Sequence, residues 1–118
     1  MAWTLYHYPG CSTCRRARAW LDARGVTYQA IDLVQTPPSA ATLAKVQALA
    51  AVPTRKLFNV SGERYREGGW KAKLPTLTDA AAHAALAADG KLIKRPILLG
   101  ARAAAVGFDE VAWAALVG

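Results

Sequence analysis

Two cysteines, Cys11 and Cys14, are the residues of this sequence best suited to covalent chemistry. They directly follow Pro9-Gly10, where the pattern changes from strand to helix. The first N–H groups of a helix lack intrahelical partners and carry partial positive charge, so a sulfur placed there is stabilised as thiolate. The positive charges of Arg15 and Arg16 would act in the same direction. These features predict that Cys11 attacks, at the exposed helix start, and that Cys14, nearer the core, resolves the adduct.

A C-x-x-C pair also occurs in zinc sites and in helices that bury two inert thiols. A zinc site would need two further ligands, and only His7 and His83 remain as histidines. The Pro-Gly turn before the motif and the strand–helix–strand pattern around it favour a redox role. We therefore expect no bound metal, and two buried, inert cysteines remain as the alternative.

Elements on both sides must position this motif. Residues Trp3 to Tyr8 are rich in aromatic and β-favouring types and predict a strand. From Ser12 the apolar residues recur at helical spacing, and Gly25 provides a stop because glycine tolerates the left-handed conformation after a helix. Residues Val26 to Val34 predict a second strand, so the chain starts as β-α-β.

The remaining sequence predicts a helical block followed by two strands and a helix. The turn Thr36-Pro37-Pro38-Ser39 supplies an N-cap, Pro53 ends the helix that follows, and Asp109 can cap the last helix. In chain order we expect a helix over 40–51, short helical turns over 54–77, a helix over 79–89, strands over 97–99 and 102–106, and a helix that ends near Leu116. No repeat or linker interrupts this order, so one α/β domain over residues 1–118 is predicted.

Length and composition are those of one small folded protein. The 118 residues are 53% hydrophobic and 19% charged, with a mean hydropathy of +0.11, which excludes a disordered chain. Two cysteines so close together cannot cross-link distant parts of a secreted fold, which excludes a disulfide-stabilised scaffold. The first residues do not resemble a signal peptide, and no apolar stretch reaches the roughly 18 residues of a bilayer span. We expect a cytoplasmic protein without membrane contact.

The net charge of +7 has two interpretations. Most of the 15 basic residues are scattered and are expected to form a solvated face. Three of them, Arg15, Arg95 and Arg55, are expected to surround Cys11 and attract an anion. Direct nucleic-acid binding is not expected, because no known nucleic-acid-binding motif or alternation of aromatic and basic residues is present. Gly68-Gly69 lacks the lysine and spacing of a phosphate-binding loop, so we infer no nucleotide or flavin.

Six motifs occur in order along nearly the whole chain: Tyr6-His7-Tyr8-Pro9-Gly10-Cys11-Ser12-Thr13-Cys14-Arg15, Thr36-Pro37-Pro38, Arg55-Lys56-Leu57-Phe58-Asn59, Tyr65-Arg66-Glu67, Lys94-Arg95-Pro96-Ile97-Leu98 and Val106-Gly107-Phe108. Together they resemble the arsenate reductase (ArsC)/Spx family. The resemblance implies a thioredoxin-like α/β fold with a mixed four-stranded sheet and a helical insertion, at about 38–90, between the second and third strands. It also implies that Pro96 is a cis-proline that faces the cysteine helix.

The resemblance further implies roles for single residues. In the arsenate reductase branch one nucleophilic cysteine works beside a basic oxyanion pocket, and glutathione with glutaredoxin regenerates it. Cys11 matches that cysteine, Arg95 matches one oxyanion-binding arginine, and His7 matches a histidine near the thiol. The family's two other oxyanion-binding arginines would align with Asn59 and close to Gly107. Much of the charge-assisted hydrogen bonding to a dianion such as arsenate is therefore absent.

Cys14 departs from the arsenate reductase branch, which commonly has serine at this position. The C-x-x-C form resembles that of Spx-type proteins, which include regulators that bind RNA polymerase and sense disulfide stress. The resemblance therefore places the chain between the two branches.

One functional expectation and one alternative follow. We expect a thiol-dependent oxidoreductase that acts on a small thiol or oxyanion substrate and needs no bound cofactor. Glutathione or a glutaredoxin is the expected electron donor, and arsenate is a poor candidate substrate. In it Cys11 is the nucleophile, and Cys14 or glutathione resolves the adduct. The alternative is an Spx-like redox-sensing transcription regulator that binds RNA polymerase. Because small members of this fold are often monomers, we also expect a monomer. The expected catalytic residues are Cys11, Cys14 and Arg95, and the expected substrate-binding residues are His7, Arg15, Asn59 and Pro96.

Overall fold

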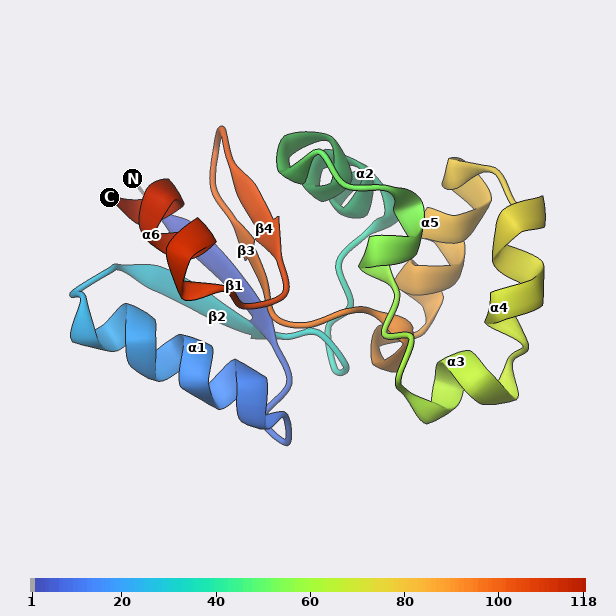
Figure 1. The fold of residues 1–118 in the computed structure, drawn as a ribbon, viewed down its shortest axis with the longest axis horizontal. Coiled ribbons are helices and arrows are strands. Elements are labelled where there is room, and N and C mark those ends of the chain that lie inside the picture. The colour runs from blue at the N-terminus through green and yellow to red at the C-terminus, as the bar shows by residue number, and fades with distance from the viewer. Residues whose placement is uncertain (1) are drawn as a thin grey trace.

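The computed structural model describes residues 2–118, and a sheet of four strands forms its centre (Figure 1). The strands are β1 (Trp3–His7), β2 (Tyr28–Asp32), β3 (Ile97–Leu99) and β4 (Ala104–Val106), in the order β2-β1-β3-β4. β1 runs parallel to β2 and antiparallel to β3, and β3 runs antiparallel to β4. The sheet is therefore mixed, as the sequence predicted.

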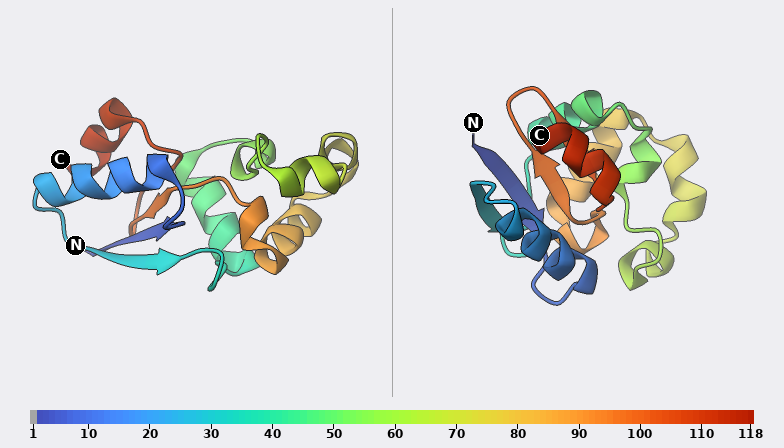
Figure 2. Two further views of the ribbon diagram at one scale, coloured as in Figure 1. Left: turned by 90° about the horizontal axis from the view of Figure 1, so that it is seen from below. Right: turned by 60° about the vertical axis from the view of Figure 1, so that its left-hand side comes forward.

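Helices flank the sheet on both sides. α1 (Ser12–Ala23) connects β1 to β2, and α6 (Glu110–Val117) follows β4; the two lie together on one side of the strands (Figure 2). The helical insertion between β2 and β3 extends away from the sheet (Figure 1). It contains α2 (Ala40–Ala50), η1 (Thr54–Leu57), α3 (Glu63–Glu67), α4 (Trp70–Lys73), η2 (Leu74–Thr76), α5 (Asp79–Ala88) and η3 (Gly90–Leu92). Within residues 2–118, none of the helices has the length and apolar character needed to span a bilayer.

The first apolar face of the sheet anchors α1. Side chains alternate along a strand, so Trp3 and Leu5 of β1 share a face with Leu98 of β3. They pack against Leu21 of α1 and Trp113 of α6, and both of these side chains are fully buried. Burial of one large apolar side chain contributes roughly 1.5–3 kcal/mol. This core fixes α1, and with it the cysteine motif at the start of that helix.

The opposite face holds the helical insertion. Ile97 of β3 and Ala104 of β4 are buried there with Leu43 and Val46 of α2 and Leu86 of α5. The sheet and the insertion therefore share one continuous core on this face.

A short backbone pairing ties the insertion to the segment that leads into β3. Phe58 and Ile93 form an isolated antiparallel bridge. The Asn59 N–H donates to the Leu92 carbonyl at 2.9 Å, and the Lys94 N–H donates to the Leu57 carbonyl at 2.8 Å. The pairing brings Asn59 beside Lys94-Arg95, and it joins segments too distant in the sequence for local patterns to predict.

Some element boundaries differ from the sequence prediction. The predicted strand Val26–Val34 is shorter at both ends, because the Val26 N–H still donates to the Leu21 carbonyl at 3.1 Å, and the Val34 N–H donates to the Asp32 carboxylate at 2.9 Å. The predicted strand over 102–106 begins only at Ala104, because the Gly100 N–H closes a turn on the Ala103 carbonyl at 2.8 Å. Tertiary hydrogen bonds thus shorten both strands.

Gly90 lies so close to the chain that follows β2 that a larger side chain does not fit there. A Cβ there would collide with the Leu33 carbonyl and lie 2.8 Å from the Val34 Cα. Gly25, by contrast, has a φ of +69°, and a Cβ at this position would have no neighbouring atom within 4 Å. We expect Gly90→Ala to lower the free energy of unfolding by at least about 3 kcal/mol through backbone overpacking. Gly25→Ala, the control, should lose only about 1–2 kcal/mol from its left-handed conformation. Urea unfolding of the two variants measures both, and equal losses would contradict this account of the packing.

Candidate functional site

The sulfur of Cys11 caps the first turn of α1. Cys11 has extended backbone angles (φ −94°, ψ 119°), and its Sγ accepts the backbone N–H of Cys14 at 3.3 Å. Its own N–H donates to the Tyr8 carbonyl at 3.0 Å, which closes the Pro9-Gly10 turn. The N-cap position of a helix normally carries an oxygen acceptor, and here a sulfur takes that role. The sulfur therefore lies where unpaired N–H groups and the helix dipole favour negative charge.

The pKa of the Cys11 thiol is lowered from its ordinary value. Partial burial is the largest single influence and raises this pKa, but several smaller ones together outweigh it. The hydrogen bond from the Cys14 side chain, those from the backbone of Cys14 and Thr13, and the positive charge of Arg95 all stabilise the thiolate. Arg95, which the sequence analysis expected near Cys11, is the cation among the causes of this shift, and Arg15 and Arg16 are not among them.

The pKa of the Cys14 thiol is shifted in the opposite direction. Its side chain is 1% exposed, and burial, followed by its hydrogen bond to the Cys11 sulfur and the negative charge of that sulfur, raises its pKa to about 12. A backbone hydrogen bond from Tyr8 and the charge of Arg95 oppose this shift without reversing it. Neither cysteine is in a disulfide. One thiol of the pair thus lies at the pocket with a lowered pKa, and the other is buried with a raised pKa.

Cys11 opens into a pocket of about 350 Å³. The pocket continues into a second hollow of about 230 Å³, and Tyr8, Asn59 and Arg95 line both. The remaining residues around the first are Gly10, Ser12, Thr13, Ser61 and Lys94, and those around the second are Gly62, Glu63, Arg64 and Lys91. The site is therefore a polar groove between the start of α1, the start of α3 and the segment before β3, with four basic side chains and one acidic one.

Arg95 is held in place by the chain around it. Its Nη1 donates to the Lys91 carbonyl at 3.1 Å and to the Ile93 carbonyl at 3.2 Å, and its guanidinium carbon lies 5.3 Å from the centre of the Tyr8 ring. The Arg95–Pro96 peptide bond is cis, as the resemblance implied. Pro96 itself is buried and is not among the residues that line the two hollows. Arg95 thus lines the same pocket as Cys11, with part of its hydrogen-bonding capacity left for an anion.

Lys94 is a pocket residue for which the sequence predicted no role. Its Cε lies 3.5 Å from where a Cβ on Gly107 would stand, so its stem passes over this glycine, and the residue lines the pocket with Cys11. Lys94 directly precedes the Arg95-Pro96 pair, and that adjacency was the one signal that could have indicated it. Lys94 therefore adds a second cation beside Arg95 to the lining of this pocket.

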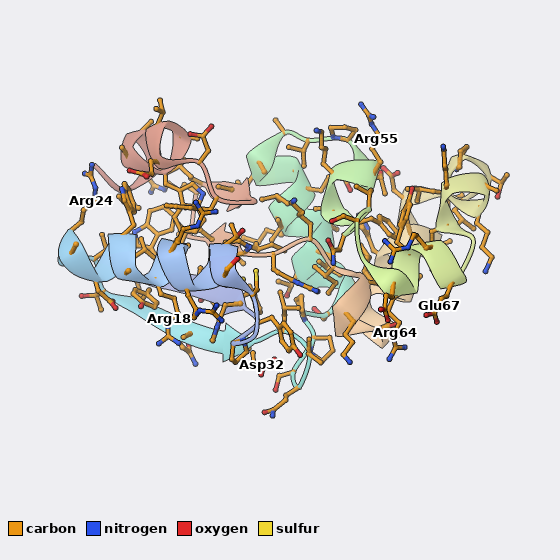
Figure 3. All side chains as sticks on the ribbon, turned by 60° about the horizontal axis from the view of Figure 1, so that its bottom comes forward. Arg18, Arg24, Asp32, Arg55, Arg64 and Glu67 are labelled. Atoms are coloured by element: carbon orange, nitrogen blue, oxygen red, sulfur yellow. The ribbon has the colours of Figure 1, made fainter. Side chains whose placement is uncertain are left out.

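Other predicted site residues lie outside the pocket lining. His7 is buried on β1, and burial, followed by the charge of Arg18, lowers its pKa, while Asp32 opposes the shift; Figure 3 marks Arg18 and Asp32. Arg15 is exposed and donates to the Pro9 carbonyl at 3.1 Å. Arg55 lines a separate hollow in the insertion, so the expectation that it surrounds Cys11 is wrong. Substrate contacts for His7 and Arg15 remain predictions.

The described residues contain no group of three or more His, Cys, Asp and Glu side chains that could hold a metal ion. His83, one of the two ligands that a zinc site would have needed, is buried in α5 and hydrogen-bonds to Gln47 at 2.7 Å between Nε2 and Oε1.

Comparisons with known proteins agree on one family. Residues 6–116 match the model of the ArsC family. The chain is 38% identical over 110 residues to YusI of Bacillus subtilis, an uncharacterized protein, with 93% of each chain covered. It is 32% identical over 104 residues to an arsenate reductase of Neisseria meningitidis, with 87% of each covered. Over 109 residues it is 27% identical to the global transcriptional regulator Spx of Lactiplantibacillus plantarum, with 90% of this chain and 79% of the regulator covered.

Solved structures agree on the fold. An ArsC-related protein of Bacteroides fragilis superposes with a TM-score of 0.94 at 37% identity, with 98% of both chains covered. A possible arsenate reductase of Streptococcus mutans superposes with a TM-score of 0.85 at 42% identity, with 90% of both chains covered. The fold is therefore thioredoxin-like, with the helical insertion between β2 and β3, as predicted from the resemblance.

The hydrogen bond between the two cysteine side chains can be tested with a matched pair of variants. Cys14→Ala removes the donor to the Cys11 thiolate, whereas Cys14→Ser keeps a hydroxyl donor at the same position. A hydrogen bond to a charged group is worth roughly 1.5–3 kcal/mol. We expect the midpoint of Cys11 alkylation against pH to rise in Cys14→Ala and to rise less in Cys14→Ser. Equal midpoints in the two variants would contradict a role for this hydrogen bond.

Proposed function

The chain belongs to the ArsC family, and on that premise we propose that it is a thiol-dependent oxidoreductase with Cys11 as nucleophile and Cys14 as resolving thiol. The observation that carries the proposal is the Cys11 sulfur, which accepts the N–H groups of α1 and faces a pocket that Arg95 also lines. A thiolate is the reactive form of cysteine, and a lowered pKa increases the fraction of thiolate at any given pH. The reaction belongs in the cytoplasm, whose thiol pool keeps such cysteines reduced.

The first step is an attack on a substrate disulfide. The Cys11 thiolate forms an S–S bond to one substrate sulfur, the substrate S–S bond breaks, and the other half leaves as a thiolate. Arg95 and Lys94 favour this step when the leaving half or its neighbourhood is negatively charged.

Cys14 resolves the adduct in the second step. Once Cys11 is in a mixed disulfide it carries no charge, so two of the three influences that raise the Cys14 pKa disappear and burial alone remains. Cys14 then transfers its proton to water and attacks the Cys11 sulfur. A Cys11–Cys14 disulfide forms, the bound half leaves as a thiolate, and two electrons have passed from the cysteines to the substrate. The first step thus removes two of the influences that disfavour the Cys14 thiolate, while burial, the largest of them, remains.

The cycle closes when an external thiol reduces the Cys11–Cys14 disulfide. Two molecules of glutathione or one glutaredoxin dithiol supply the two electrons, and no bound cofactor is needed. Where glutathione intercepts the mixed disulfide first, it takes the resolving role of Cys14.

The pocket favours an anionic substrate of low charge over arsenate. Arg95 and Lys94 supply two cations next to Cys11, while Asn59 contributes a neutral amide. A neutral amide makes weaker hydrogen bonds to a dianion than a guanidinium does. We therefore propose a small disulfide or oxyanion with a single negative charge near the reacting atom as substrate class, and arsenate as a poor substrate.

Mass spectrometry after exposure to oxidised glutathione tests the assignment of the two cysteines. Wild type should pass through a glutathionyl adduct on Cys11 and end as the internal Cys11–Cys14 disulfide. Cys14→Ser should stop at the adduct on Cys11, and Cys11→Ser should stay unmodified. Modification of Cys11→Ser at Cys14 as fast as wild type is modified would overturn the proposal.

The role of the pocket cations can be tested with two disulfides of opposite charge. Lys94→Met and Arg95→Met should each slow the reaction with oxidised glutathione roughly tenfold relative to cystamine at low ionic strength. Arg102→Met, at an exposed position that does not line the pocket, removes the same charge and serves as control. Equal slowing toward both disulfides, or an equal effect of the control, would mean that the pocket cations do not select the substrate.

A second candidate function is supported by the C-x-x-C pair and by the similarity to Spx. In that role the Cys11–Cys14 disulfide would switch the binding of RNA polymerase. Immobilised protein should then retain purified polymerase, and oxidation should change the retained amount, with no such change in Cys14→Ser. Absence of polymerase from the eluate under both conditions would exclude this function.

A further inference from the structure

The helical insertion carries two adjoining hollows that the chemistry at Cys11 does not use. Their volumes are about 340 Å³ and about 390 Å³, and Tyr65 and Lys71 line both. We call them together the insertion groove, defined by Arg55, Val60, Tyr65, Arg66, Lys71 and Leu77. The groove runs over η1, α3, α4 and the segment before α5.

Exposed apolar side chains concentrate at this groove. Among the described residues, three large apolar side chains are exposed: Val60 at 55%, Leu77 at 36% and Val111 at 82%. Val60 lines one hollow of the groove and Leu77 lines the other, while Val111 lies on α6. Contiguous exposed apolar surface with a polar rim is typical of binding sites.

The aromatic side chains beneath the groove hold it in shape. The rings of Tyr65 and Phe58 lie 6.3 Å apart, and those of Phe58 and Trp70 lie 5.6 Å apart. Phe58 is 1% exposed and belongs to the core, and Lys73 lies over the Trp70 ring at 5.0 Å. Tyr65 is therefore braced from below, and a ligand would meet a preformed surface.

The rim of the groove is positively charged. Arg55, Arg66 and Lys71 line it, and Asp79 is the one acidic residue among the lining side chains. The Asp79 carboxylate accepts the hydroxyl of Thr54, which occupies part of its hydrogen-bonding capacity. The groove thus combines apolar hollows with three cations.

The groove lies directly behind the wall of the Cys11 pocket. Asn59 and Ser61 line that pocket, whereas Val60 and Tyr65 line the groove. Arg64 of α3 lines the catalytic side, and in Figure 3 it projects from the opposite side of the insertion to Arg55. A molecule bound in the groove therefore contacts the same loop that forms one side of the pocket.

We propose that the insertion groove is a docking surface for an acidic segment of a partner protein, with apolar or aromatic side chains that enter the two hollows. Charge complementarity favours this occupant, because Asp and Glu side chains match the cationic rim. A second copy of this chain is disfavoured as occupant by the net charge of +7, which makes copies repel one another. The proposal goes beyond the oxidoreductase function and does not depend on the chemistry of Cys11.

Three short peptides of matched length provide the probes. One carries Phe and Leu between Asp and Glu residues, the second has the acids replaced by Asn and Gln, and the third has Phe and Leu replaced by Ser. In ¹⁵N-labelled protein, the first should shift the amide signals of Val60, Tyr65, Lys71 and Leu77. Its Kd should be at least about tenfold lower than those of the other two at low ionic strength.

Charge reversals locate the binding on the protein. Lys71→Glu, at an exposed position, should weaken binding of the acidic peptide roughly tenfold. Arg24→Glu, on the far side at the end of α1, reverses the same charge away from the groove and should leave Kd within about twofold of wild type. Circular dichroism checks that both variants are folded, and Cys11→Ser should bind the peptide as wild type does.

Four results would overturn the docking proposal: similar Kd values for the three peptides, amide shifts confined to the Cys11 pocket, no effect of Lys71→Glu, or tighter binding of a single-stranded oligonucleotide to the same amides. Concentration-dependent dimerisation without peptide that Lys71→Glu abolishes would assign the groove to a second copy instead. Loss of peptide binding with intact reactivity at Cys11 would leave the oxidoreductase function standing.

Discussion

The unpaired N–H groups at the start of α1 are the constraint on which the site depends. A helix start needs an acceptor, and in this chain the acceptor is the Cys11 sulfur, which accepts the Cys14 N–H. The same contact that completes the helix therefore stabilises a thiolate. Cys14, buried one turn further on, adds a donor to that thiolate and is held as a thiol by it. The two sulfurs have the same chemistry in isolation, and their positions relative to one helix terminus make them different.

The rest of the molecule brings cations to this sulfur. The sheet holds α1 through the buried Leu21 and Trp113, and the opposite face holds the insertion. The bridge between Phe58 and Ile93 then aligns the insertion loop with the segment that ends in the cis-proline. Arg95 and Lys94 reach the pocket from that segment. The insertion therefore contributes one wall of the pocket on one side and an apolar, cationic groove on the other.

Local signals explain how much the sequence could predict. Pro9-Gly10, Gly25 and the helical periodicity after Ser12 are local, and they place β1, α1 and the start of β2 within a few residues. The pairing of the insertion with the segment before β3 depends on distant backbone groups, so no local pattern contained it. The direction of an exposed arginine is equally invisible in a sequence: Arg15 turns back to a carbonyl, and Arg55 lines another hollow. Lys94 was missed because no local pattern shows that an exposed lysine before β3 lines a pocket formed with the start of α1.

The central claim is that the start of α1 lowers the pKa of Cys11 while burial raises that of Cys14. The most direct measurement is the pH titration of the ¹³Cβ chemical shifts of both cysteines in the reduced protein. The account predicts that Cys11 titrates well below about 8.5, the ordinary cysteine value, and that Cys14 does not titrate until strongly alkaline pH. A Cys11 midpoint at or above about 8.5, or a Cys14 that titrates first, would contradict it.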